Sequence, residues 1–418
     1  MLSRIQNKLN AFPRRYLKIG KNAGTLFGLS GLQRILGLAT TYFLVRALSQ
    51  ESYGEYNFIL SAMVVLSLFS LPGLNNSIMQ SVARGNPGTY REALPLSFFS
   101  SFLGSLVLGG FGVWYVSHNN NELASSFFLA AALFPFANGL DKWASIKLGK
   151  EEFASIARLR GSASLLTSLL IIAGIYLVPG NIFVPIGILL LVKAIQNLIM
   201  TYTSIRKIGK DQPTETGSLA YGVKTSFYGG IGLAAKHIDK FLIFYFLSPA
   251  SMAIYVAAQR FPELVKQLIK TLATVIAPRF AKHEFYTKRL DFFIKIFSVS
   301  AAAVLVLFAF TLLPWLVVLI FGESYAEAVP YSQALMCTVA IAGSVPLRIR
   351  FIKSKLDERS FRKITLIRSA IQIVSNAIFI PTIGLAGAVV TAFITRIITT
   401  ATVHFIIKKN YLNQEEAL

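Results

Sequence analysis

The sequence predicts an all-α polytopic membrane protein, with about twelve transmembrane helices in two six-helix pseudo-repeats around a central cavity. Over 418 residues, 54% are hydrophobic and 14% are charged, and the mean hydropathy is +0.58. This chain is therefore more apolar than an ordinary soluble domain. Apolar tracts of membrane-spanning length recur along it. A weak internal repeat then relates its two halves.

Each predicted span is an apolar tract of about 20 residues or more, bounded by charged or turn-forming residues. The approximate limits are residues 25–47, 55–83, 93–116, 124–146, 161–178, 182–205, 219–247, 251–277, 293–320, 328–347, 364–381 and 384–407. The predicted regions are a basic cytoplasmic segment 1–24, an N-terminal six-helix bundle 25–205, a cytoplasmic linker 206–218, a C-terminal six-helix bundle 219–407 and a cytoplasmic tail 408–418.

The distribution of basic residues predicts the orientation. The net charge is +22, and 30 of the 41 Lys and Arg residues fall in alternate connections, from residues 1–24 to Lys408 and Lys409. The intervening connections contain none. This asymmetry follows the positive-inside rule and places both termini in the cytoplasm. Anionic lipid headgroups then account for the basic loops without a nucleic-acid partner. The N-terminal segment lacks the apolar core of a cleaved signal peptide.

A shift of 199 residues aligns the two halves. It superposes "ALSQESYGEYNF" (47–58) on "FLSPASMAIYVA" (246–257), and it matches Ser49 with Ser248 and Ser52 with Ser251. An even number of spans in each half gives a parallel repeat, which is a common plan of secondary transporters.

Ionisable residues within the spans are the candidate functional residues. A charge at the bilayer centre costs at least about 2.5 kcal/mol, so it is expected to face a polar cavity. The predicted cationic lining comprises Arg34, Lys193, Lys224, Lys236, Lys240, Arg260, Lys266, Lys270 and Arg396. On each of the seventh and eighth spans the charged positions share one helical face. Cations in such excess favour an anionic ligand, and several ammonium groups suit phosphate or pyrophosphate. In the alternative interpretation, the charges pair with one another and hold helices together.

Three carboxylates are candidates for coupling to Na⁺ or H⁺, namely Asp239, Glu263 and Asp141. Asp239 lies nine residues before Ser248, which is about 14 Å along a helix and close to mid-membrane. His237 lies at the edge of the same face, where a packing role or a proton relay are alternatives.

Two stretches resemble a known family. "LQRILGLATTYFLVRALSQESYGEYNFILSAMVVLSLFSLPGLNNSI" is similar to the opening of bacterial polysaccharide transport proteins, the Wzx-type lipid-linked oligosaccharide flippases of the multidrug/oligosaccharidyl-lipid/polysaccharide exporter superfamily. "HIDKFLIFYFLSPASMAIYVAAQRFPELVKQLIKTLATVIAPRFAK" resembles the seventh and eighth spans of that family. The resemblance extends over about residues 20–410, and Ala253 replaces the glycine of the second outer turn. Arg34 and Asp239 are the two site residues that it carries over.

The resemblance implies outward flipping of an undecaprenyl-pyrophosphate-linked oligosaccharide, such as an O-antigen unit, across the bacterial cytoplasmic membrane. It implies transport by alternating access, coupled to a cation gradient and without a cofactor. The partners that it implies are membrane lipids, a polysaccharide polymerase and other assembly proteins. The alternatives are a cation-coupled multidrug exporter and a membrane-embedded glycosyltransferase or ligase. An acidic cavity is expected of the first alternative and a catalytic site in a large outer loop of the second. No ATP-binding motif occurs, and the single cysteine, Cys337, reads as a buried hydrophobe. We therefore expect no enzymatic activity.

Overall fold

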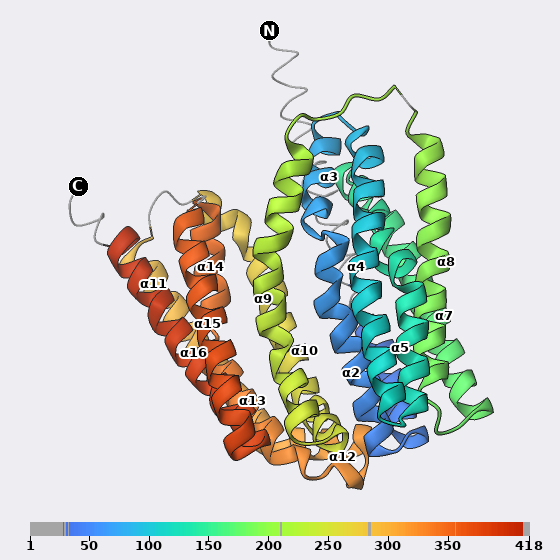
Figure 1. Ribbon diagram of the computed structural model, residues 1–418. Helices are drawn as coiled ribbons and strands as arrows, with labels where there is room; N and C mark the ends of the chain where they lie inside the picture. Colours follow the sequence, from blue (N-terminus) through green and yellow to red (C-terminus); the bar gives the residue numbers. More distant parts are fainter. Residues whose placement is uncertain are drawn as a thin grey trace. The chain divides into compact units, whose positions relative to one another are not determined.

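The computed structural model describes residues 28, 31, 33–209, 211–282, 286–355 and 357–412, with backbone alone at 272, 274–282, 288–290 and 412. Throughout these ranges the regular elements are helical, and no strand occurs, so the predicted all-α class is confirmed (Figure 1). The predicted segment 1–24 and residues 413–418 of the predicted tail lie outside the described residues. The chain forms two compact units, one of residues 1–48 and 62–230, the other of residues 49–61 and 231–418.

Unit 1 contains a helix over residues 33–47, residues 62–66 at the end of α2 (Gln50–Leu66) and residues 218–230 at the start of α9 (Ser218–Phe246). Its other elements are η1 (Ser67–Ser70), α3 (Gly73–Ala83), α4 (Thr89–Ser117), α5 (Asn121–Phe134), η2 (Pro135–Gly139), α6 (Trp143–Gly149), α7 (Phe153–Leu177) and α8 (Phe183–Lys207).

Unit 2 contains the start of α2 (Gln50–Leu66) and the rest of α9 (Ser218–Phe246). Its other elements are α10 (Pro249–Lys282), α11 (Lys288–Thr311), α12 (Leu313–Phe321), η3 (Glu323–Tyr325), α13 (Ala328–Ile341), α14 (Val345–Ser354), α15 (Glu358–Ile383), α16 (Leu385–Ile407) and η4 (Lys408–Leu412).

Seven helices of the described part of the chain are long and apolar enough to cross a membrane, and two bent helix pairs raise this number to nine. The predicted count of twelve therefore stays a prediction. The long helices α9 and α10 are not among these nine, and both carry several charged residues, among them Lys236 and Lys240 on α9.

Backbone breaks interrupt several predicted spans. The predicted span 55–83 bends by 49° between η1 and α3, where Leu71 has a φ of 52° and Pro72 cannot donate a helical hydrogen bond. The Gly73 amide donates instead to the Ser226 hydroxyl at 2.8 Å. A Cβ at Gly73 would lie 2.3 Å from the Gly222 carbonyl oxygen, so glycine permits this close approach. The predicted span 293–320 is likewise divided into α11 and α12.

The 206–218 linker packs against unit 1. The Gly88 amide donates to the Pro213 carbonyl at 3.0 Å, and the Glu215 amide donates to the Thr89 hydroxyl at 3.0 Å. Arg84 Nη2 donates to Glu215 Oε2 at 2.9 Å. This contact lowers the pKa of the Glu215 carboxyl from its ordinary value because it stabilises the ionised form.

The internal repeat appears in the structure as two identical helix caps. The Ser49 hydroxyl accepts the Ser52 amide at 3.0 Å, and the Ser248 hydroxyl accepts the Ser251 amide at 3.0 Å. The paired hydroxyls are also hydrogen bonded, at 2.9 Å in the first cap and 3.0 Å in the second. These caps begin α2 and α10, at positions related by the 199-residue shift. A serine cap accepts an otherwise unpaired amide of the first helical turn.

Gly54 marks a close crossing of α2 and α10 within unit 2. A Cβ at this position would lie 1.9 Å from the Pro249 carbonyl oxygen. The repeat-related Ala253 is fully buried and accommodates its own Cβ. The glycine of the first outer turn therefore has a steric role that its counterpart does not share.

We predict that Gly54→Ala destabilises the protein by about 1–3 kcal/mol, because its Cβ forces α2 away from the Pro249 carbonyl. The measurement is thermal unfolding of purified protein in detergent. Gly109→Ala on α4 is the control, because a Cβ there meets nothing within 4 Å and alanine favours the helix by about 1 kcal/mol. A Gly54→Ala protein that melts at or above the wild-type temperature would contradict the prediction.

Candidate functional site

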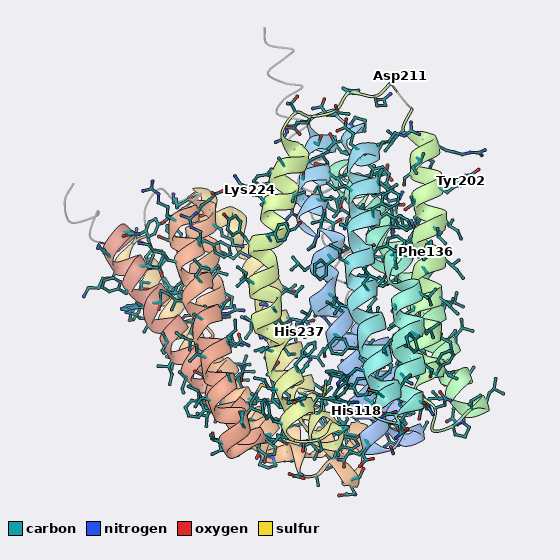
Figure 2. All side chains as sticks on the ribbon, viewed as in Figure 1. His118, Phe136, Tyr202, Asp211, Lys224 and His237 are labelled. Carbon is teal, nitrogen blue, oxygen red and sulfur yellow. The ribbon has the colours of Figure 1, made fainter. Side chains whose placement is uncertain are left out.

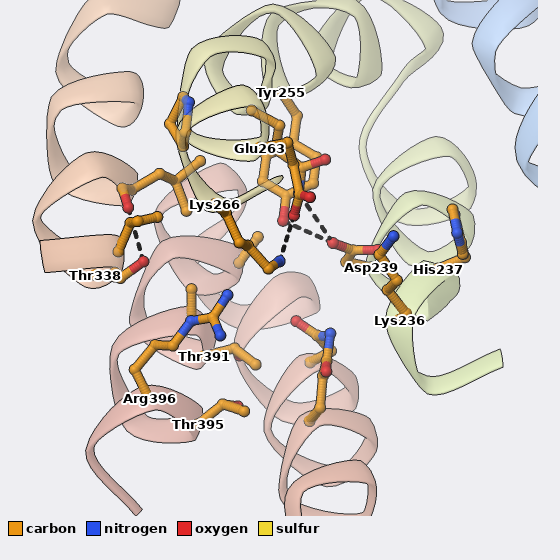
Figure 3. A pocket seen from close by; sticks show the side chains of 18 of the residues that line it. Lys236, His237, Asp239, Tyr255, Glu263, Lys266, Thr338, Thr391, Thr395 and Arg396 are labelled. Carbon is orange, nitrogen blue, oxygen red and sulfur yellow. Dashed lines mark hydrogen bonds and ion pairs between the residues drawn. The ribbon is translucent and has the colours of Figure 1, made fainter. Parts of the chain in front are cut away.

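A polar cavity of about 250 Å³ lies within unit 2, between α9, α10, α13, α15 and α16. We call it the charged pocket. Its wall contains six of the residues that the sequence predicted as site residues. They are Lys236, Asp239, Lys240, Glu263, Lys266 and Arg396. Figure 3 shows Asp239 from α9, Glu263 and Lys266 from α10 and Arg396 from α16 converging on this space.

Asp239 is buried, with 5% of its surface exposed. Its Oδ2 accepts hydrogen bonds from Tyr255 Oη at 2.7 Å and from Gln259 Nε2 at 3.2 Å. Among the described residues, none of the lysines or arginines forms an ion pair with it at 4.0 Å or less. The described contacts therefore do not show the predicted alternative, in which Lys236 or Lys240 forms an ion pair with Asp239. Neutral donors hold this carboxylate instead. They are Tyr255 and Gln259 of α10 at Oδ2 and the Lys240 backbone amide of α9 at Oδ1.

Glu263 fits the alternative interpretation of the sequence, in which the charges pair with one another. Its Oε1 contacts Lys266 Nζ one helical turn along α10, as an i,i+3 ion pair (Figure 3). Both side chains are partly buried, so removal of either partner would leave a charge in a poorly solvated place. The two acids of the charged pocket thus differ, since Glu263 has a cationic partner and Asp239 has neutral hydrogen-bond donors.

Uncharged polar residues complete the wall, and the sequence analysis did not select them. Gln372 and Asn376 lie four residues apart on α15, and Thr391 and Thr395 lie four apart on α16. This spacing places each pair on one helical face. Asn376 Oδ1, Thr391 Oγ1 and Thr395 Oγ1 are buried without a hydrogen-bond partner among the described residues. The wall therefore presents several oxygens whose bonding capacity the described chain leaves unused. The i,i+4 pattern was the available sequence signal.

Arg368 is the second omission. It falls inside the predicted span 364–381, but it was not among the predicted site residues. In the structure α14 continues to Ser354 and α15 begins at Glu358. Arg368 lies on α15 and lines the charged pocket, whereas Arg348 is 4% exposed and donates to Asp291 at 2.9 Å.

A second cavity of about 320 Å³ adjoins the charged pocket and shares Lys266, Val339, Arg368 and Arg396 with it. We call it the basic pocket. Lys270, another predicted site residue, lines it. Arg260 lines neither cavity. Its positive charge lies close enough to Tyr56 to interact with that side chain.

The remaining predicted residues belong to unit 1. Lys193 Nζ donates to Asn138 Oδ1 at 2.8 Å, where η2 interrupts the helical path after α5. Asp141 Oδ1 lies 3.7 Å from Arg160 Nη2. That Lys193 and Asp141 line one cavity together with the residues of unit 2 stays a prediction.

Two further predicted cations lie elsewhere in unit 1. Arg34 is half-buried on the helix of residues 33–47. Lys224 borders a mainly apolar groove with Leu96 and Phe227, and it lies farther up α9 than His237 in Figure 2. Their part in a shared anion lining likewise stays a prediction.

Solved structures with the same fold are membrane transporters. A multidrug resistance MATE family transporter of the MOP superfamily, inward-facing, matches with a TM-score of 0.67 and 14% identity, covering 93% of this chain and 98% of that chain. A MOP superfamily transporter from Pyrococcus furiosus Vc1 (DSM3638) has a TM-score of 0.66 and 15% identity, covering 94% and 95%. The lipid II flippase MurJ, inward closed, has a TM-score of 0.65 and 16% identity, covering 92% and 87%.

No curated protein sequence matches this chain. The sequence profile of the family described as "Polysaccharide biosynthesis protein" matches residues 19–284, which is more than half of the chain. That region includes both stretches on which the predicted resemblance rested, as well as α9 and α10. The chain therefore belongs to the polysaccharide biosynthesis protein family.

Proposed function

We propose that this protein flips a lipid-linked oligosaccharide, carried on undecaprenyl pyrophosphate, from the inner to the outer leaflet of the bacterial cytoplasmic membrane. The observation that carries the proposal is the cationic wall of the charged pocket, with Lys236, Lys240, Lys266, Arg368 and Arg396 on helices that lie in a mainly apolar bundle. Positive charge in a low-dielectric site attracts phosphate groups strongly. A pyrophosphate-linked glycan supplies two such groups and many hydroxyls.

The family and the fold of this chain both support the proposed transport of a lipid-linked oligosaccharide. The family description concerns polysaccharide biosynthesis, and one structural neighbour is a lipid II flippase. Alternating access by a protein with both termini in the cytoplasm is part of the proposal, as is assembly with a polysaccharide polymerase. Multidrug exporters share the fold. The excess of cations in the charged pocket favours an anionic cargo over a cationic drug, and a neighbour with this fold is itself described as having a binding pocket of reverse polarity.

Asp239 is the proposed coupling residue for Na⁺ or H⁺. Its carboxylate is buried beside Tyr255 and Gln259. Asn376 Oδ1 and Thr391 Oγ1, which have no hydrogen-bond partner in the described part of the chain, belong to residues that line the same pocket. Oxygen atoms of this kind suit a small hard cation. Glu263 is a weaker candidate because Lys266 already pairs with it, and Asp141 remains a candidate in unit 1.

We predict that Lys240→Ala or Lys236→Ala lowers glycan export about tenfold or more, because each substitution removes a charged contact worth about 1.5–3 kcal/mol to an anionic cargo. Export is measured as surface glycan in a flippase-deficient strain that carries the variant. Lys408→Ala, an exposed lysine beyond α16, is the control. Full export by both pocket variants, at membrane levels equal to wild type, would refute the anionic-cargo mechanism.

We predict that Asp239→Asn abolishes the dependence of transport on an ion gradient, since the amide keeps the size of the side chain but loses its charge. The measurement compares substrate flipping in reconstituted vesicles with and without Na⁺ and H⁺ gradients. Glu358→Gln, an exposed acid in the first turn of α15, is the control. An Asp239→Asn protein whose flipping still follows the gradient would remove Asp239 from the coupling step.

A further inference from the structure

The charged pocket and the basic pocket follow one another along the helices of unit 2. On α10 the charged pocket is lined between Tyr255 and Gln267, and the basic pocket between Lys266 and Ala273. On α15 residues between 368 and 376 line the charged pocket, and residues 361 and 368 line the basic pocket. The two cavities are therefore stacked end to end within the helix bundle of unit 2.

One residue from each of four helices lies where the two cavities meet. These residues are Lys266 on α10, Val339 on α13, Arg368 on α15 and Arg396 on α16, and each of them lines both pockets. We call these four residues the ring. Figure 3 shows Lys266 and Arg396 pointing into the same space. A solute that moves from one pocket to the other passes these side chains, three of which are cationic.

The ring has an excess of positive charge. Arg396 lies close enough to Lys266 and to Arg368 for their charges to interact. Lys266 forms an ion pair with Glu263, whereas neither arginine of the ring forms an ion pair at 4.0 Å or less with an acid of the described chain. Glu263 also interacts electrostatically with both arginines. One carboxylate therefore faces three cations.

The basic pocket continues this positive charge beyond the ring. Lys270, Arg350 and Lys353 line it, and among the described residues no Asp or Glu does. Lys353 lies one residue before the end of α14, and Phe361 of the same wall lies in the first turn of α15. The pocket thus reaches the connection between α14 and α15, which the proposed orientation places in the cytoplasm.

Positive side chains around a passage of low dielectric repel cations. The repulsion between two charges a few Å apart is several times stronger there than in water, and fixed positive charges of this kind exclude both cations and protons from membrane pores. A charged side chain in the middle of a membrane helix also costs at least about 2.5 kcal/mol. An apolar side chain would fill the same space without this cost, so packing alone does not account for Arg368 and Arg396.

We propose that the ring is a charge barrier that stops Na⁺ and H⁺ from passing between the charged pocket and the cytoplasmic end of unit 2. Lys266, Arg368 and Arg396 supply the repulsion, and Val339 completes the perimeter. The inference rests on the proposed coupling at Asp239 for its physiological purpose. A coupled transporter dissipates the gradient when its ion crosses without cargo. With this route closed, the ion leaves Asp239 only when the transporter changes conformation.

The test measures ion leak through the full-length protein in liposomes, without glycan cargo. Uptake of radioactive Na⁺ is followed directly, and uptake of H⁺ is followed with an enclosed pH-sensitive dye. Wild type is expected to match liposomes without protein. We expect Arg368→Gln and Arg396→Gln to raise the uptake of at least one of these ions about tenfold or more above wild type, because each removes a repelling charge. Wild-type rates for both ions in both variants would overturn the barrier.

Arg362→Gln is the matched control, because it removes the same charge from an exposed position of α15 that lines neither pocket. Two further variants separate charge from size. Arg396→Lys keeps the charge, and Val339→Ala widens the ring without changing its charge, so both are expected to remain as tight as wild type. A leak through Val339→Ala equal to that through Arg396→Gln would show a steric barrier and overturn the proposal. If a glutamine variant unfolds in detergent, methionine at the same position takes its place.

The leak measurement also distinguishes this proposal from the proposed coupling. Leaky ring variants, together with an Asp239→Asn protein whose flipping still follows the gradient, would remove Asp239 from coupling and leave the barrier in place. Tight ring variants, together with loss of gradient dependence in Asp239→Asn, would refute the barrier alone.

Discussion

The cost of charge in an apolar helix bundle determines the organisation of unit 2. Asp239 is buried near the end of α9, seven residues before Phe246, and it is held by Tyr255 and Gln259 from α10. Glu263 and Lys266 form an ion pair along one helix, and Arg348 and Asp291 pair between α14 and α11. Each arrangement lowers the penalty that an isolated charge would carry. In the walls of the two pockets the cations outnumber the acids, so these walls carry an excess of positive charge.

Breaks in the helices release backbone groups and turn helix faces toward the sites, which a continuous helix does not do. The bend at Pro72 releases an amide that Ser226 accepts, and the bend before Val345 turns α14 so that one face enters the core while the other lines the basic pocket. Irregular backbone at membrane depth is tolerated where protein or a cavity covers it. Both breaks satisfy this condition. The interruptions thus belong to the construction of the sites as well as to helix packing.

The sequence predicted the all-helical class, the family and the charged faces of α9 and α10, because apolar length, motif residues and helical spacing are local properties. Lys236, Asp239, Glu263 and Lys266 line one pocket, whereas Lys224 and Arg260, which the predicted faces also contained, do not line it. Partner choice is not local, so the hydrogen bond of Asp239 to Tyr255 was not predicted. Arg368 was missed because a single basic residue near the end of a predicted span, here 364–381, looks the same in the sequence as one whose side chain extends to the membrane surface. Asn376 and Thr391 were missed because uncharged polar residues are common in membrane helices and carry little signal alone.

The hydrogen bonds of Asp239 also affect how the protein is made. A ribosome delivers α9 to the translocon before α10, yet both side-chain donors for the Asp239 carboxylate, which bind its Oδ2, are on α10. Leu247 and Ser248 alone connect the two helices, so the donors emerge soon after the acid. Entry of the two helices into lipid as one hairpin therefore avoids exposing an unpaired carboxylate to hydrocarbon. Tyr255 and Gln259 thus bear on co-translational insertion as well as on the folded state.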